Sequence, residues 1–213
     1  MAPAWKNFEF VDYEGKCRAI LLFGMPGSGK GTQGTVLGQL PDLVHISMGD
    51  VFRKIPKLGK LGAEIENYTS VGKMVPDDLT VRIFERHVKI LELQEFFLPA
   101  QQTLILDGLP RNRAQAEQLD AILDVVQVFH LNIDDVKLAM KRLRARALRE
   151  NRLDDMSDEV IKRRLNTYHE ETFKTLSFYS PELIYKIEAG QAMIHVLRDI
   201  VNRLSELRDA GIA

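Results

Sequence analysis

The residues best suited to chemistry follow the first apolar run of the chain. Residues 24–32 read Gly-Met-Pro-Gly-Ser-Gly-Lys-Gly-Thr and precede a segment with helical periodicity. Glycines let such a loop curl with its N–H groups pointing inward, while the helix N-terminus and the Lys30 ammonium add positive charge. This arrangement is typical of a loop that binds the phosphates of a nucleoside triphosphate. Because Gly31 follows the lysine, the hydroxyl comes one position later, at Thr32, and we expect it to contact Mg²⁺ through water.

A carboxylate ends another apolar run. Residues 103–106 read Thr-Leu-Ile-Leu, and Asp107 follows them directly. If this strand neighbours the strand before the glycine-rich loop, Asp107 lies beside the phosphates and holds the hydration shell of Mg²⁺. The alternative is an ordinary aspartate in the turn after a strand.

A basic cluster occupies residues 141–152, where Glu150 is the only acid among six cations. Like charges at helical spacing repel, so such a segment favours an anion. Arg142 and Arg146 share a helix face and can reach one polyphosphate, whereas we expect Arg144 and Arg149 to be solvated. The alternative is a solvated basic face or a nonspecific patch for nucleic acid.

Composition excludes several classes of protein. The chain has 213 residues, with 29 Lys and Arg against 30 Asp and Glu, so no global field attracts nucleic acid or an anionic membrane. Cys17 is the only cysteine, which excludes an intrachain disulfide and a multi-cysteine zinc site. No apolar run approaches the length of a membrane span, and the N-terminus does not resemble a secretory signal. We expect a cytoplasmic location.

Five short apolar runs alternate with longer segments of helical periodicity. This alternation predicts an α/β fold with a parallel sheet covered by helices on both faces. The strands are expected at 19–23, 43–46, 103–106, 125–131 and 183–187. The helices are expected at 30–40, 49–54, 60–70, 77–92, 113–123, 134–149, 157–179 and 192–208. The two longest connections, after the second and fourth strands, are candidate flaps over the carboxyl edge of the sheet.

Four ordered motifs resemble those of the adenylate kinase family: the loop at 24–32 and residues 45–53, 72–79 and 107–111. The resemblance spans about residues 18–205. It implies a P-loop NTPase fold of the nucleoside monophosphate kinase type, with a five-stranded parallel sheet flanked by helices. It also implies a single kinase domain at 17–213 after an extension at 1–16, a nucleotide-binding flap at 47–76 and a short lid at 146–156. The lid lacks a cysteine-rich zinc insertion, so no zinc is expected, and we expect a monomer.

The resemblance also implies which residues hold the donor and carry the transfer. For ATP binding it implies Gly27, Ser28, Gly29, Lys30, Gly31, Thr32, Arg142 and Arg146. For catalysis it implies Lys30, Arg111, Arg142, Arg152 and Arg164, with Asp107 and Thr32 holding Mg²⁺ through water. Either Arg163 or Arg164 could be the active-site arginine downstream of Arg152. Alignment on Tyr168 favours Arg164, while counting residues from Asp154 favours Arg163.

For the acceptor nucleotide, the resemblance implies that Arg53 and Arg111 bind the phosphate and that Gln115 hydrogen-bonds to the base. The full acceptor set is Met48, Arg53, Lys73, Met74, Val75, Gly108, Leu109, Pro110, Arg111, Gln115, Arg152 and Arg164. The Gln115 amide matches the donor and acceptor edge of adenine. Asn112, however, resembles the branch that phosphorylates pyrimidine nucleotides, and Met48 stands where the family usually has Thr.

The resemblance implies a kinase that transfers the γ-phosphoryl group of MgATP to AMP and forms two ADP. The acceptor phosphate is already deprotonated in the cell, so the chemistry needs cations around the phosphates rather than a general base. Transfer is expected in line, without a covalent intermediate. The alternatives are a UMP/CMP kinase with the same chemistry, a noncatalytic nucleotide sensor and, least favoured by the net charge, a nucleic-acid binder.

Overall fold

The centre of the molecule is a five-stranded sheet in which every strand is parallel to its neighbours. A computed structural model of the chain describes residues 15–150 and 157–212. The strand order is β2-β3-β1-β4-β5. The strands are β1 (Cys17–Phe23), β2 (Leu43–Ser47), β3 (Thr103–Asp107), β4 (Leu123–Asn132) and β5 (Ile184–Glu188). The parallel sheet and the P-loop NTPase fold predicted from the sequence are confirmed.

Strand β1 shows why these residues form a central strand. It reads Cys-Arg-Ala-Ile-Leu-Leu-Phe, and every side chain except Arg18 is buried, as expected for a strand that is covered on both faces. Leu22 lies opposite Asp107 in the parallel pairing of β1 with β3. The register therefore brings the carboxylate at the end of β3 next to the loop that leaves β1.

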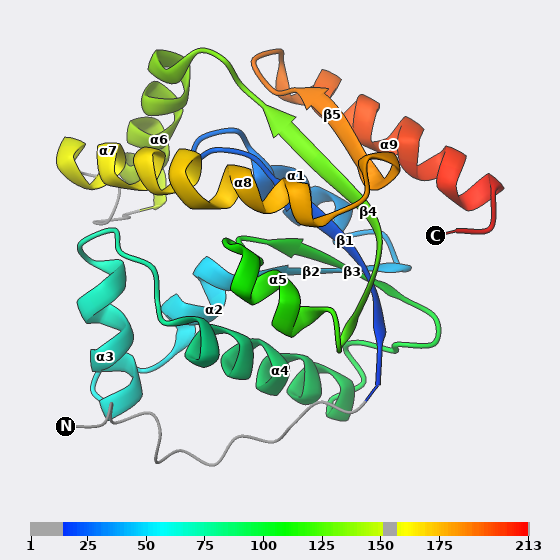
Figure 1. Cartoon of the computed structure of the whole chain (residues 1–213), viewed down its shortest axis with the longest axis horizontal. Coiled ribbons are helices and arrows are strands. Elements are labelled where there is room, and N and C mark those ends of the chain that lie inside the picture. The colour runs from blue at the N-terminus through cyan, green and yellow to red at the C-terminus, as the bar shows by residue number, and fades with distance from the viewer. Residues whose placement is uncertain (1–14, 151–156, 213) are drawn as a thin grey trace.

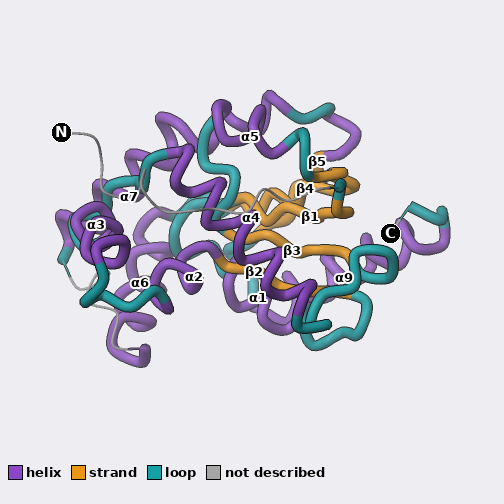
Figure 2. Tube along the Cα trace, turned by 90° about the horizontal axis from the view of Figure 1, so that it is seen from below, coloured by secondary structure: helices purple, strands orange, loops and turns teal. Residues whose placement is uncertain are grey.

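Helices cover both faces of this sheet. Helices α2, α4 and α5 lie on one face, and α1, α6, α7 and α9 lie on the other, while α3 lies to one side and adds Ile65 to the first apolar cluster (Figure 1). In the view from below, the strands lie behind α4 (Figure 2). The helices are α1 (Lys30–Leu37), α2 (Met48–Lys54), α3 (Lys60–Thr69), α4 (Asp77–Leu93), α5 (Arg113–Leu119), α6 (Val136–Glu150), α7 (Asp158–Thr167), α8 (Phe173–Thr175) and α9 (Met193–Asp209).

Successive side chains of β1 belong to two separate apolar layers, one on each face of the sheet. Leu21 and Phe23 join the cluster under α2 to α5, whereas Ile20 and Leu22 join the cluster under α1, α6, α7 and α9. Successive side chains of a strand point to opposite faces, so one strand supports both layers. This central position holds the start of the glycine-rich loop in place.

Two predicted helices differ from the structure. The helix expected over 113–123 ends at Leu119, because Ile122 O accepts the Cys17 N–H at 2.9 Å and β4 begins at Leu123. The single helix expected over 157–179 is broken by a π-helical turn, Tyr168–Thr172, and a short 3-10 turn, Leu176–Phe178. Apolar periodicity alone does not mark these changes of backbone winding.

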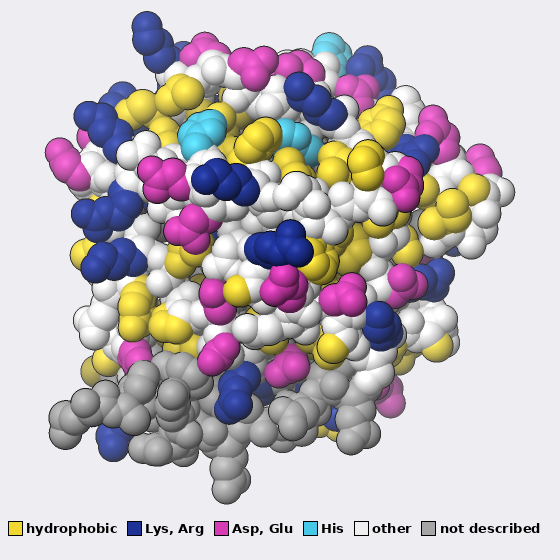
Figure 3. All heavy atoms as spheres, viewed as in Figure 1, with side chains coloured by type: hydrophobic (Ala, Val, Ile, Leu, Met, Phe, Trp, Pro, Cys, Tyr) yellow, Lys and Arg dark blue, Asp and Glu magenta, His cyan; other side chains and the backbone are white. Residues whose placement is uncertain are grey.

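The surface carries charges of both signs. On the face drawn in Figure 3, Lys and Arg side chains are interspersed with Asp and Glu, in keeping with the formal net charge of −1. Within residues 15–150 and 157–212, no helix has the length and apolar character needed to cross a bilayer.

Candidate functional site

The glycine-rich loop connects β1 to α1 and packs tightly against α6. Gly27 adopts φ +87°, and a Cβ built on it would lie 2.5 Å from Ala139 O. Gly24 has φ +148°, and its Cβ would lie 2.5 Å from Leu131 O. Both positions therefore require glycine, because a side chain would meet backbone as well as an unfavourable φ.

Lys30 is the first residue of α1, and its ammonium group turns back into the loop. Lys30 Nζ donates to Gly24 O at 2.6 Å and to Met25 O at 3.2 Å. Burial lowers the Lys30 pKa to about 8; Asp107 opposes this shift, while Arg111, Arg146 and Arg164 add to it. Several positive charges thus converge on one point, a site that favours a polyanion.

A cavity of about 820 Å³ opens between the loop, the end of the sheet and the helices around it. Its lining contains most residues expected to hold ATP: Gly27, Gly29, Lys30, Gly31, Thr32, Arg142 and Arg146. Ser28, the remaining expected residue, is buried and does not line the cavity. Asp107 lines it too, and its Oδ2 lies 3.4 Å from where a Cβ of Gly31 would stand. The expected donor set therefore surrounds one space.

The two arginines on the shared face of α6 both line the cavity. Arg142 Nη1 donates to Ala189 O at 2.7 Å and Arg142 Nη2 to Gln191 O at 3.2 Å, so this guanidinium also holds the connection between β5 and α9. Arg149, which the sequence assigns to solvent, is exposed and also borders the cavity. The exposed face at the end of α6 therefore lies at the opening of the cavity.

Arg111 lies where the donor and acceptor sides meet. Its Nε donates to Gly108 O at 3.0 Å, which holds the guanidinium against the end of β3. Burial lowers the Arg111 pKa to about 10; Arg164 and Arg53 add to this shift, while Asp107 opposes it. A guanidinium held among other cations gains most from an anion placed between them.

The acceptor residues divide into two groups. Those that line the cavity are Arg53, Met74, Gly108, Pro110, Arg111 and Arg164. Those that do not are Met48, Lys73, Val75, Leu109 and Gln115. In the second group only Lys73 is exposed, and the buried apolar members belong to the core under α2 to α5. The structure thus brings Met74 and the arginines expected to hold the acceptor phosphate to the cavity, whereas Gln115, the expected base contact on α5, is buried and does not line it.

The neighbours Arg163 and Arg164 occupy different places. Arg164 lines the cavity, whereas Arg163 Nη1 donates to Val71 O at 2.6 Å, joining α7 to the loop after α3. Arg152, expected in catalysis and acceptor binding, lies outside the described residues, as do Asp154 and most of the predicted lid at 146–156.

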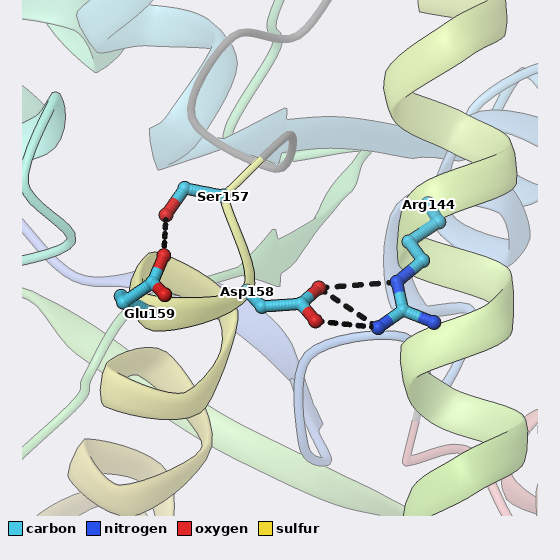
Figure 4. Close-up of polar contacts among 4 residues, drawn as sticks. All are labelled: Arg144, Ser157, Asp158 and Glu159. Atoms are coloured by element: carbon cyan, nitrogen blue, oxygen red, sulfur yellow. Dashed lines mark hydrogen bonds and ion pairs between the residues drawn. The ribbon is translucent and has the colours of Figure 1, made fainter.

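Helices α6 and α7, on either side of the predicted lid, are joined by an ion pair. Arg144 Nη2 donates to both carboxylate oxygens of Asp158 at 2.8 Å, and Ser157 Oγ donates to Glu159 Oε2 at 2.5 Å (Figure 4). Arg144 therefore points away from the cavity, as its position on another face of α6 predicts.

Sequence reasoning missed Asp77, the first residue of α4. Asp77 Oδ1 accepts Gln115 Nε2 at 2.7 Å and Asn112 Nδ2 at 2.8 Å. The family motif at 72–79 includes this carboxylate, but only the tertiary contact between α4 and α5 shows its partners. Asn112, taken as a sign of the pyrimidine branch, caps α5 by accepting the Gln115 N–H at 2.9 Å.

A phosphate loop on a parallel sheet, with an aspartate at the end of the adjacent strand and converging arginines, defines a phosphoryl-transferring P-loop protein. A sequence model of the family "Adenylate kinase" matches residues 22–184. Among its relatives is an adenylate kinase of Cyanothece sp., 35% identical over 200 residues, which cover 91% of this chain and 98% of that protein. The Flavobacterium psychrophilum adenylate kinase is 34% identical, covering 88% and 96%, and the Micrococcus luteus enzyme is 39% identical, covering 87% of each chain. The chain belongs to the adenylate kinase family and is a nucleoside monophosphate kinase.

Proposed function

We propose that the protein transfers the γ-phosphoryl group of ATP to AMP and forms two ADP, with the residues assigned above. The observation that carries this proposal is the convergence of Lys30, Arg111, Arg146 and Arg164 on one cavity bordered by Asp107. Two nucleotides placed tail to tail would fill that space with phosphate oxygens. The named relatives, all adenylate kinases, support the choice of acceptor.

The chain supplies positioning and charge rather than a general base. Lys30 and the loop amides hold the donor phosphates, and Arg53 and Arg111 hold the acceptor phosphate. Transfer then runs in line: the acceptor oxygen forms the new P–O bond as the bond to the β-phosphate oxygen of ATP breaks. Arg164 and Arg152 complete the set of guanidiniums that stabilise the charge on the transferred group. Closure of the flap and lid excludes water, which would otherwise compete as acceptor.

Magnesium fits the hard oxygen donors at the end of β3. Asp107 offers a carboxylate and Thr32 a hydroxyl, and both border the cavity. Within the described ranges, no group of three or more His, Cys, Asp and Glu side chains lies close enough to hold a metal by itself. A hydrated Mg²⁺ ion held by Asp107 and Thr32 through water suits this sparse donor set. When bound, the ion would neutralise charge on the donor phosphates.

Asn112 has a structural role in this fold that does not depend on the acceptor base. Its Oδ1 accepts the Gln115 N–H at the start of α5, and its Nδ2 donates to Asp77. The assignment to a monomer in the cytoplasm belongs to this proposal as well.

A substrate panel tests the proposal directly. Initial rates of ADP formation from ATP are measured with AMP, UMP, CMP and GMP at equal concentration. We expect AMP to be the fastest acceptor. Fastest turnover with UMP or CMP would overturn the base assignment, and no turnover with any acceptor would identify a nucleotide-binding relative without kinase activity.

A further inference from the structure

A buried polar network joins the start of α4 to the start of α5. The Gln115 side chain is only 1% exposed, and both ends of its amide have hydrogen-bond partners. Its Nε2 donates to Asp77 Oδ1 at 2.7 Å, and its Oε1 accepts the Arg111 N–H at 2.7 Å. Helices α4 and α5 lie side by side, which makes this contact possible (Figure 1). The amide lies one hydrogen bond behind the cavity wall, because Arg111 lines the cavity.

These partners permit a single orientation of the amide. A carboxylate accepts hydrogen bonds and a backbone N–H only donates, so Nε2 must face Asp77 and Oε1 must face Arg111. The reverse orientation would place the amide oxygen against the Asp77 carboxylate and the amide N–H₂ against the Arg111 N–H. In a buried site, those unpaired groups would be strongly unfavourable.

We propose that Asp77 is a positioning residue that fixes the orientation of the Gln115 amide and thereby sets the preference for adenine over 6-oxopurines. This inference rests on the proposed function, in which Gln115 reads the acceptor base. Asp77 is placed to do so because it also holds Asn112, whose Oδ1 caps the same helix at the Gln115 N–H. The amide and its helix are thus fixed by one carboxylate.

The fixed amide presents one donor and one acceptor in a set order. Of its two N–H groups, one is used by Asp77, and of the two oxygen lone pairs, one is used by Arg111. Among the described residues, this leaves one N–H and one lone pair for a base. Adenine offers an acceptor at N1 and a donor at its 6-amino group, which match this order. Hypoxanthine and guanine offer a donor at N1–H and an acceptor at O6, which match only a reversed amide.

The test compares AMP with IMP, because the two purines have the same size and reversed edges. Removal of the carboxylate in Asp77→Ala takes away one of the two partners that orient the amide and leaves only the Arg111 N–H. We expect the ratio of kcat/KM for AMP to that for IMP to fall by about tenfold or more, mainly through KM. An unchanged ratio in folded Asp77→Ala protein would overturn the inference.

Asp78→Ala is the matched control. Asp78 also lies in the first turn of α4 and also reaches α5, since its Oδ1 accepts Gln118 Nε2 at 3.3 Å, but at an exposed position. Loss of Asp78 removes the same helix-dipole contribution and a similar contact between helices. We expect it to leave the ratio for AMP and IMP at the wild-type value, and an equal fall in both variants would assign the effect to helix docking.

Asp77→Asn keeps the test decisive if Asp77→Ala does not fold. The asparagine can present either its oxygen or its N–H₂ to Gln115, so both amides can turn together. We expect a smaller fall in selectivity than in Asp77→Ala, and an unchanged ratio in this variant would also count against the inference.

A second readout does not depend on activity. Hydrogen exchange of the Gln115 side-chain N–H₂, followed by NMR, is expected to be slow in the wild-type protein and at least tenfold faster in Asp77→Ala. Equal exchange in both would contradict the positioning role. Wild-type protein that fails to phosphorylate AMP would instead refute the proposed function, so the two failures are distinguishable.

Discussion

The glycine-rich loop lies on one side of the cavity, and α7 with the loop after α3 lies on the other. These two sides are held in different ways. The glycine-rich loop contacts backbone of β4 and α6 at Gly24 and Gly27, and Lys30 is tied to two loop carbonyls. Across the cavity, the described contacts between α7 and the loop after α3 include a hydrogen bond from exposed Arg163 and close packing of Gly72 on Val160. The comparison teaches that the expected donor site is built on close backbone contacts, while the opposite side of the cavity includes an exposed hydrogen bond, which contributes little to stability.

The largest expected effect is at Lys30. Lys30→Met removes the cation from the expected donor site and leaves a side chain of similar length. We expect kcat/KM for ATP to fall by about 10²- to 10³-fold, because the donor phosphates lose a fixed positive charge beside them. Steady-state kinetics measure the fall, with circular dichroism to confirm folding. Wild-type turnover in folded Lys30→Met protein would refute the donor-site assignment.

The adjacent arginines of α7 allow a paired experiment. Arg164→Ala is expected to lower kcat by roughly 10- to 100-fold, because a cation that lines the cavity is lost. Arg163→Ala removes only an exposed bond to Val71 O and is expected to change kcat by less than about fivefold. Single-turnover measurements separate transfer from product release. A larger loss in Arg163→Ala would reverse the assignment of the two residues.

The pH profile tests the charge at the donor site. Lys30 has a pKa of about 8 in the free protein, so its phosphate-binding form is lost as the pH rises through that value. The ionisation of the nucleotide phosphates is complete well below this range. We expect kcat/KM for ATP to fall about tenfold per pH unit above pH 8, approaching a slope of −1 on a logarithmic plot. Initial rates at subsaturating ATP from pH 6.5 to 10 measure it, and a flat profile would contradict a buried ammonium.

The smallest expected effect is at the ion pair between Arg144 of α6 and Asp158 of α7. Both side chains of the Arg144–Asp158 pair are about half exposed, at 54% and 48%. Arg144→Ala should therefore lower the free energy of unfolding by at most about 1 kcal/mol and leave the KM for ATP unchanged. Urea denaturation and steady-state kinetics check the two parts. A tenfold rise in KM would show that Arg144 serves the nucleotide site instead.

Local pattern predicted the strands, the phosphate loop and the position of Asp107, because buried parallel strands are continuous apolar runs and the loop has a fixed composition. It missed the ends of elements where backbone winding changes, as at Leu119 and Tyr168. It also missed the contacts of Asp77, since these depend on which helix faces which. Which residues share one face of a helix can be predicted from their spacing in the sequence. Contacts between α4 and α5 are known only from the folded chain.

The contacts that hold α6 in place have a consequence for engineering. Ala139 and Arg142 fix the lower part of α6 to the phosphate loop and to the connection after β5, and Arg144 closes on Asp158 above them. Residues 150 and 157 therefore lie near contacts that join α6 to the phosphate loop and α6 to α7. Substitutions between these two positions that keep Arg152 are therefore expected to leave the phosphate loop in its original shape.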